Sequence, residues 1–401
     1  MKSIRFSLGI LLCFYSSLSL AQWTKDANYP GGLTNAAIGF SIQDTVYIGG
    51  GASGLTSFYK FDPSNGKWTR KSPLVLPCAA GVSFAIGSRG YVALGEANPT
   101  KANALASVTN GLWEYDPQLD LWTQKATFPG VPRFGAIAFV IGNIAFVGGG
   151  ADSNGFVQDD FFSYNPATDT WSTLQVLPEY LCFWATFTIG NFGYLATGSE
   201  GSNELSTVWR YDPSIDSWKQ MSDFPGAPRQ AAVGFALNGK AYVGLGQAQS
   251  DTVFSDFYSY EPTTDQWTPA TSFPAAHGRA YANGIATSNG AFVGLGAYFT
   301  GQGLFGNNDL WMFAPSAGVK NPAPGPDLNV YPNPTLGFVN LSLPQSTLSA
   351  RIIVRNSIGA TCITTQVGSD GRVDLSCLPC GIYNIDISSA GYHSTQRVVK
   401  I

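Results

Sequence analysis

The residues of this chain that could do chemistry gather around a series of glycine clusters. Three arginines precede apolar, strand-like segments, a histidine lies near the third arginine, and four other polar residues follow glycine clusters. These residues are Arg133, Arg229, Arg279, His277, Glu96, Asp152, Glu200 and Gln247. Guanidinium groups pair with carboxylates and other anions, and carboxyl groups can transfer protons when their pKa suits the task. Brought together, these side chains would form a polar binding site.

Histidine chemistry is nearly excluded by composition. The chain has only two histidines, His277 and His393. Acid–base catalysis and nucleophilic triads most often use histidine, and so do many metal sites. We therefore predict no catalytic residue set, no metal site and no cofactor.

The arginines also allow a purely structural interpretation. Pro132-Arg133 and Pro228-Arg229 repeat one dipeptide at corresponding places in the chain. Such a recurring arginine can brace neighbouring structural units instead of meeting a ligand. The residue types alone leave both interpretations open.

A sixfold repeat must position these residues. An aromatic residue and a glycine cluster are followed each time by an aromatic-x-Pro unit, and in five cases by a tryptophan. The six units are Phe61-Asp62-Pro63, Tyr115-Asp116-Pro117, Tyr164-Asn165-Pro166, Tyr211-Asp212-Pro213, Tyr260-Glu261-Pro262 and Phe313-Ala314-Pro315. Their prolines are 54, 49, 47, 49 and 53 residues apart. Short apolar runs between turn signals, such as Asn238-Gly239, predict strands joined by hairpins.

Over residues 22 to 315 this pattern resembles the kelch repeat, whose period is about 50 residues. The resemblance implies an all-β fold, a six-bladed kelch β-propeller. The sixth unit has no tryptophan after it, whereas Trp23-Thr24 at the start matches Trp68-Thr69. We therefore expect the N-terminal strand to complete the last blade and close the ring.

In such a blade, the loop entering the first strand and the loop leaving the second share one face. This places the eight polar candidates at the mouth of the central channel. The leaving loops of repeats two and six are the longest and that of repeat one is the shortest. We hypothesise a groove over repeat one.

The tail predicts a second module. Residues 316 to 327 are rich in proline, glycine and alanine and are expected to form a linker. Residues 328 to 401 contain Val330-Tyr331-Pro332-Asn333-Pro334, Leu378-Pro379-Cys380-Gly381-Ile382-Tyr383 and a final Arg397-Val398-Val399-Lys400-Ile401. This series resembles the type A sorting domain of type IX secretion substrates, a small β-sandwich. The resemblance implies engagement with the type IX machinery, secretion or surface attachment by way of the periplasm, and a Bacteroidetes-type bacterium.

The N-terminus has the features of a signal peptide over residues 1 to 21. Lys2 and Arg5 precede the apolar run from Phe6 to Leu20, and we expect cleavage between Ala21 and Gln22. Fifteen apolar residues are fewer than the roughly 20 that cross a bilayer, and we predict no transmembrane segment. Export permits disulfides, and Cys362 is expected to pair with Cys377 or Cys380.

Charge and composition restrict the classes of partner that this protein could bind. Residues 22 to 327 carry 15 basic and 23 acidic residues, which argues against nucleic acid because phosphate binding needs a basic face. Kelch-type copper oxidases hold their metal with two histidines, which the propeller lacks. We predict a secreted or surface binding module for a glycan or an extracellular protein. The alternative is a sugar-modifying enzyme that resembles the kelch-type sialic acid mutarotases (epimerases).

Overall fold

The computed structural model divides into two units, Met1–Ser316 and Ala317–Ile401, and each is described by itself. It describes residues 22–97, 107–201, 203–249, 252–300 and 303–314 of the first unit, and 329–331, 333–342, 351–356, 361–366, 372–389 and 392–401 of the second. The expected signal peptide and linker lie outside these residues. Within the described ranges we find no helix of the length and hydropathy needed to cross a bilayer.

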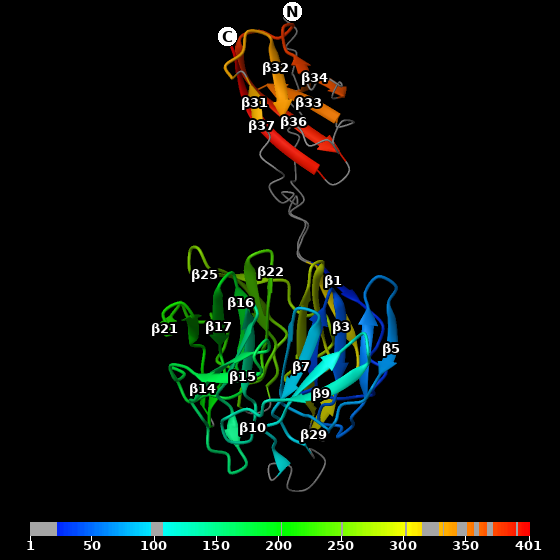
Figure 1. Ribbon diagram of the computed structural model, residues 1–401, viewed down its shortest axis with the longest axis vertical. Helices are drawn as coiled ribbons and strands as arrows, with labels where there is room; N and C mark the ends of the chain where they lie inside the picture. Colours follow the sequence, from blue (N-terminus) through cyan, green and yellow to red (C-terminus); the bar gives the residue numbers. More distant parts are fainter. Residues whose placement is uncertain are drawn as a thin grey trace, which may run out of the picture. The chain divides into compact units, whose positions relative to one another are not determined.

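The first unit is built from six four-stranded antiparallel sheets (Figure 1). We number these sheets as blades one to six in chain order, with the innermost strand given first. Blade one is β2 (Ile38–Ile42), β3 (Thr45–Gly49), β4 (Phe58–Asp62) and β5 (Lys67–Lys71), and blade two is β6 (Val82–Ile86), β7 (Arg89–Ala93), β8 (Leu112–Asp116) and β9 (Leu121–Lys125). Blade three is β11 (Ile137–Ile141), β12 (Ile144–Gly148), β14 (Phe161–Asn165) and β15 (Thr170–Thr173), and blade four is β16 (Ala185–Ile189), β17 (Phe192–Ala196), β20 (Val208–Asp212) and β21 (Ser217–Gln220). Blade five is β22 (Val233–Leu237), β23 (Lys240–Gly244), β24 (Phe257–Glu261) and β25 (Gln266–Ala270), and blade six is β26 (Asn283–Thr287), β27 (Gly290–Gly294), β30 (Leu310–Ala314) and β1 (Gln22–Lys25).

The innermost strands form a closed ring around a channel. Each of β2, β6, β11, β16, β22 and β26 neighbours the next, and β26 neighbours β2. Side chains alternate along each of them between buried and half-buried, as Ile38, Gly39 and Phe40 do on β2, because successive strand residues point to opposite sides. The channel-facing hydroxyls bond to the neighbouring blade, and Thr186 Oγ1 donates to the Ala138 carbonyl at 3.0 Å. The channel wall therefore consists of small residues whose polar groups hold the blades together.

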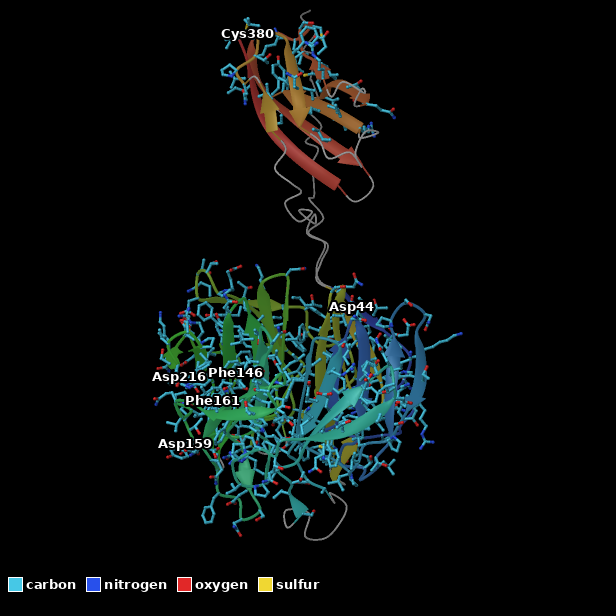
Figure 2. The ribbon with its side chains drawn as sticks, viewed as in Figure 1. Asp44, Phe146, Asp159, Phe161, Asp216 and Cys380 are labelled. Atoms are coloured by element: carbon cyan, nitrogen blue, oxygen red, sulfur yellow. The ribbon has the colours of Figure 1, made fainter. Side chains whose placement is uncertain are left out.

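The space between blades is filled by aromatic rings. In blade three, Phe146 and Phe161 lie with their ring centroids 6.0 Å apart (Figure 2). Phe161 meets Tyr211 of blade four edge-on, at a centroid distance of 5.1 Å. Burial of such large rings supplies most of the driving force for blade packing. The repeated aromatic residues of the sequence are thus core residues.

A tyrosine–aspartate pair joins each of blades two to five to the blade before it. In blade three, Tyr164 Oη donates to Asp169 at 2.8 Å, and Asp169 also accepts from the Ala126 backbone N–H of blade two at 2.9 Å. Tyr115–Asp120, Tyr211–Asp216 and Tyr260–Asp265 repeat the arrangement. Blade one has Phe61 and Gly66 at the two positions, so the hydroxyl and its acceptor are absent together.

We expect Tyr164→Phe to lower the free energy of unfolding by about 1–2 kcal/mol at pH 7, because it removes a hydrogen bond to an ionised carboxylate. Burial by itself would raise the pKa of Asp169, but the bonds from Ala126 and Tyr164 outweigh it and the pKa is lowered. A lowered carboxyl pKa stabilises the fold above the unfolded value of about 3.9 and loses that effect as pH falls through the folded value. The deficit of the variant should therefore shrink below about pH 4. Urea unfolding across this pH range measures it.

Tyr258→Phe is the matched control, because the half-buried Tyr258 lies outside the tyrosine–aspartate pairs. Its stability should stay within roughly 0.5 kcal/mol of the parent. An equal loss in both variants would show that the Asp169 bond contributes nothing specific.

The N-terminal strand completes blade six. Strand β1 pairs antiparallel with β30, with Trp23 opposite Phe313. Trp23 Nε1 donates to the Thr271 carbonyl of the blade-five loop at 3.0 Å. Trp171 makes the equivalent bond to Ala126 at 2.8 Å. The first strand of the propeller and the last thus share one sheet, as expected from the displaced tryptophan.

The second unit is a small β-sandwich of two sheets. One sheet is β31 (Asn329–Tyr331), β32 (Phe338–Ser342) and β35 (Arg372–Asp374), and the other is β34 (Thr361–Gln366), β33 (Arg351–Asn356), β36 (Gly381–Ser389) and β37 (Tyr392–Lys400). Residues of both sheets, among them Val339, Val373, Ile352 and Ile385, share one buried apolar cluster. This unit has its own core and needs no surface from the propeller to complete it.

Candidate functional site

Short hairpins and bridges gather on one face of the propeller, which we call the hairpin face. Strand β10 (Arg133–Phe134) pairs with β13 (Ala151–Asp152), β18 (Ser199–Glu200) with β19 (Asn203–Glu204), and β28 (Ala297–Thr300) with β29 (Gly303–Gly306). In Figure 1, β10 and β29 mark this face at the foot of the propeller. The loop entering a first strand pairs with the loop leaving the second, as in the Ala280–Ala297 bridge. The expected shared face is therefore present.

A closed ring of backbone hydrogen bonds encircles the channel just inside the hairpin face. Each blade contributes one residue whose N–H donates to the corresponding carbonyl of the preceding blade, at 2.8 to 3.2 Å. The six residues, all with positive φ, are Ala36, Ala80, Gly135, Phe183, Ala231 and Tyr281. The left-handed conformation is costly for non-glycine residues and persists only where the surroundings enforce it. The ring gives the mouth of the channel a rigid rim.

The rim and the residues that follow it line a cavity of about 170 Å³. Four blades contribute only alanine and glycine, whereas blade four contributes Phe183 and Trp184 and blade six contributes Tyr281. Phe183 and Tyr281 meet edge-on with their ring centroids 5.2 Å apart. None of the residues that line the cavity in the described part of the chain is charged. The cavity therefore offers aromatic surface and a few polar atoms in an uncharged setting.

Polar atoms have unmet hydrogen-bonding capacity in Trp184, which lines the cavity, and in Gln247, which contacts Tyr281 but does not line the cavity. Trp184 Nε1 is buried and has no partner in the structure, and the same holds for Gln247 Oε1. Gln247 Nε2 donates to Tyr281 Oη at 3.4 Å, so the Tyr281 hydroxyl hydrogen is free to point elsewhere. Burial, with smaller contributions from Cys182, Glu204 and Glu96, raises the pKa of Tyr281 to about 12. A buried polar atom without a partner costs about 1–3 kcal/mol, so water or a ligand is expected to satisfy these groups.

A second polar group lies beside the cavity on blades four and five. Ser199 Oγ donates to Gln230 Oε1 at 2.8 Å, and the Cys182 Sγ lies 3.6 Å from Ser199 Oγ. Burial raises the pKa of Cys182 above its usual value, so this thiol is protonated at neutral pH. These side chains satisfy one another and position Gln247, whose backbone pairs with that of Gln230.

The structure separates the four candidates that follow glycine clusters into two pairs. Glu96 and Gln247 directly follow the last glycine of their repeats. The residues at the same position in three other repeats, Ala151, Ser199 and Ala297, are buried. Asp152 and Glu200 come one residue later, and strand residues alternate in direction. Glu200 is exposed, and Asp152 Oδ1 accepts from the backbone N–H groups of its own turn at Asn154 and Phe156. Gln247 therefore reaches Tyr281 at the rim and Glu96 is half-buried, whereas Asp152 is bonded within its own turn and Glu200 is exposed.

The three arginines are braces in this structure, which corrects their placement at the mouth. Arg133 and Arg229 are fully buried and Arg279 is 4% exposed. Arg229 pairs with both oxygens of Asp256 at 2.6 and 3.0 Å and donates to the Leu245 carbonyl at 2.9 Å. Arg133–Asp160 and Arg279–Asp309 repeat the pair. Each guanidinium also lies over a phenylalanine ring of its own loop, as Arg229 does over Phe224 at 4.8 Å. The terminal N–H groups of each guanidinium are thus occupied by its aspartate, and Arg279 Nε is buried without a partner.

His277 lies on the hairpin face but outside the cavity lining. Its exposed ring stacks on Tyr298 of β28, with centroids 4.5 Å apart and planes 14° apart. It does not meet the polar groups of the mouth. The groove expected over repeat one depends on the long loop of repeat two, and residues 98 to 106 of that loop lie outside the described residues.

Sequence reasoning missed the aromatic residues of the cavity. The available signal was a comparison between repeats. Each repeat contributes a rim residue and the residue after it to the cavity. Four repeats have only alanine or glycine at these two positions, whereas the fourth has Phe183-Trp184 and the sixth has Tyr281-Ala282. A large residue where the other repeats are small indicates a special site.

The described residues contain no group of three or more His, Cys, Asp or Glu side chains arranged to hold a metal ion. Cys362, Cys377 and Cys380 are exposed, and the structure forms no disulfide between Cys362 and Cys377. All three lie near enough to contribute to the raised pKa of Tyr383, after burial as the main cause. Burial raises the pKa of Cys78 in the propeller to about 12, which makes it an unreactive thiol.

Comparisons with known proteins agree with this architecture. Residues 329–401 match the secretion system C-terminal sorting domain, and residues 194–225 match the Kelch motif. Kelch-like protein 35 of Mus musculus is 22% identical over 229 residues, which is 55% of this chain and 36% of that protein. Kelch-like protein 25 of Xenopus tropicalis is 24% identical over 196 residues, or 46% and 32%. The chain spans about a third of the length of these relatives.

The solved structure of YjhT superimposes with a TM-score of 0.61 at 18% identity, covering 71% of this chain and 96% of that one. At this identity the likeness concerns the fold alone. The sorting domain implies export by type IX secretion to the cell surface or beyond. By its repeats, its ring of blades and its tail, this chain is a kelch-repeat β-propeller protein with a C-terminal secretion sorting domain.

Proposed function

We propose that this protein is an exported carbohydrate-binding propeller that holds one sugar ring at the mouth of its channel. The observation that carries the proposal is the cavity with its three aromatic residues, Phe183, Trp184 and Tyr281, together with the unpartnered polar atoms of Trp184 and of the neighbouring Gln247. Ligand sites typically combine apolar and aromatic walls with a few polar groups. A pyranose ring matches this combination, because its C–H faces pack on aromatic rings while its hydroxyls both donate and accept hydrogen bonds.

The size and charge of the cavity favour a neutral sugar. Its volume of about 170 Å³ is below the range of roughly 300–1,000 Å³ that is typical for drug-sized ligands. One ring is therefore a better match than a larger molecule. The arginines that would attract an acidic sugar are buried and paired, and Glu96 and Glu204 lie near Tyr281. A carboxylate ligand would meet negative charge there and no available cation.

Titration with neutral monosaccharides, followed by calorimetry and tryptophan fluorescence, tests the proposal. Tyr281→Ala and Trp184→Phe should each weaken binding roughly tenfold, because each removes stacking surface or a hydrogen-bond donor. Trp113→Phe is the control, since Trp113 lies on β8 and does not line the cavity. Equal affinities in all three variants, or binding of acidic sugars alone, would refute a neutral-sugar site at the channel mouth.

A sugar-modifying enzyme is the second candidate, and Glu96 is the observation that favours it. Burial raises the pKa of Glu96, and this residue contributes to the environment of Tyr281. A carboxyl group with a raised pKa can donate and accept protons near neutral pH. The same titration, followed by NMR of the anomeric protons, distinguishes the two. An enzyme would speed anomeric exchange and lose that effect in Glu96→Gln, whereas a binding protein would leave the exchange rate unchanged.

A further inference from the structure

Blade six carries an exposed aromatic surface beside the cavity, which we call the blade-six platform. It consists of His277, Tyr298, Leu304 and Phe305, with Leu33 at its edge. Leu304 and Phe305 are 44% and 39% exposed and Leu33 is 64% exposed. Tyr298 of β28 stacks on His277 of the loop entering blade six and on Phe305 across the hairpin, at centroid distances of 4.5 and 6.1 Å. Exposed apolar groups gathered at one place mark a binding surface.

The platform is joined to the cavity wall through the backbone of one bridge, and none of its residues lines the cavity itself. The Ala280–Ala297 bridge joins the loop entering blade six to the start of β28, with backbone bonds of 2.9 and 2.8 Å. Tyr281 follows Ala280 on the cavity side, and Tyr298 follows Ala297 on the platform side. The two tyrosines are thus about two ladder positions apart, or roughly 7 Å along the strands. At the other end of the hairpin, Thr34 pairs with Asn307, which places Leu33 alongside.

The blade-six hairpin contains no acidic side chain, lysine or arginine, unlike the equivalent hairpins. No Asp, Glu, Lys or Arg occurs between Ala280 and Asn308. The position of Tyr298 is occupied by Asp152 in the blade-three hairpin and by Glu200 in the blade-four hairpin. Blade six alone among these three hairpins therefore presents aromatic rings where the others present carboxylates.

We propose that the blade-six platform is an outer subsite for the same ligand, which is therefore a neutral oligosaccharide or polysaccharide and not a free monosaccharide. This inference rests on the proposed function. One ring of the glycan occupies the cavity against Tyr281, and the following rings lie over His277 and Phe305. The hairpin surface, which has no lysine or arginine, suits a chain without carboxylate or sulfate groups. The cavity binds the ring at one end of the glycan, and contacts with the platform increase the affinity as the glycan becomes longer.

Calorimetry on residues 22–401 with a length series of neutral sugars tests this. The probes are glucose, mannose and galactose with their cello-, manno- and galacto-oligosaccharides up to six rings. Affinity should rise roughly tenfold from one ring to the length that covers the platform. Tyr298→Ala and Phe305→Ala should remove this rise and leave the affinity for the single ring unchanged. Tyr281→Ala should weaken binding at every length.

Asp152→Ala, at the position equivalent to Tyr298 in blade three, is the control and should retain the full rise. Thermal unfolding of each variant verifies that the propeller is intact. Single-ring binding with no length dependence, or a length dependence that survives Tyr298→Ala, would overturn the platform while leaving the cavity proposal standing. Absence of binding to any neutral sugar, or binding of acidic sugars alone, would overturn both.

Discussion

Asp256→Ala is expected to lower the free energy of unfolding of the propeller by roughly 3 kcal/mol, the lower end of the range for breaking a buried ion pair. Arg229 is fully buried and loses both bonds to its carboxylate in this variant. The Leu245 and Ala227 carbonyls still accept from the guanidinium, but they cannot neutralise it. Asp256 is 34% exposed, so water can reach part of the vacated space and moderate the loss. Guanidinium chloride unfolding, monitored by tryptophan fluorescence, measures it.

Two further variants show whether the effect belongs to the pair. Asp223→Ala removes an exposed aspartate from the loop that carries Arg229 and should change stability by no more than about 0.5 kcal/mol. The double variant Arg229→Met with Asp256→Leu should recover much of the loss, because apolar replacement of a whole buried pair is often neutral. If Asp256→Ala behaves like Asp223→Ala and sugar binding is lost instead, the arginines serve the ligand and not the blades.

Trp23→Ala should destabilise the propeller by roughly 3 kcal/mol, and deletion of residues 22–25 should destabilise it further. Trp23 packs against Phe257, Phe273 and Phe313 at centroid distances of 5.4, 5.2 and 4.8 Å. The deletion also removes the β1–β30 ladder and leaves β30 as an open sheet edge. Thermal unfolding and the rate of proteolysis at β30 both report the change.

Thr24→Ala is the control for closure, because Thr24 is exposed on the same strand. The Thr24→Ala variant should keep the β1–β30 hydrogen bonds intact and should change the midpoint of thermal unfolding very little. A Trp23→Ala variant as stable as Thr24→Ala would mean that the ring is held without the N-terminal strand.

The repeat made the fold predictable from the sequence. A single aromatic-x-Pro unit is ambiguous, but six of them at one period specify blades, and the displaced Trp23 indicates which blade contains the first strand. The turn chemistry is local as well. Tyr164 and Asp169 are five residues apart, so their pairing can be inferred once the blade is recognised. These features depend on short-range spacing, which a sequence displays directly.

The face that carries the candidate residues was predictable, because the shared face of the entering and leaving loops follows from blade topology. The roles of Glu96 and Gln247 in a binding site stay predictions. The prediction placed Asp152 and Glu200 on the same side as Glu96 and Gln247, although they come one residue later in their repeats. Successive side chains of a strand point in opposite directions. The arginines were placed at the mouth although Asp256 lies 27 residues beyond Arg229. A partner at that separation becomes visible only when the blade is folded.

The sequence by itself determined the architecture: a kelch propeller of six repeats, its closure by the first strand, and a separate sorting tail. These follow from periodicity and from motifs that are contiguous in the chain. Only the tertiary structure decided which side chains share the cavity. Phe183 and Trp184 of blade four and Tyr281 of blade six line it, Gln247 of blade five bonds to Tyr281, and the closed ring brings the three blades together. The physical reason is that closure around an axis makes neighbours of residues about 50 or 100 positions apart, and hydrogen bonding and burial there depend on all of the blades at once.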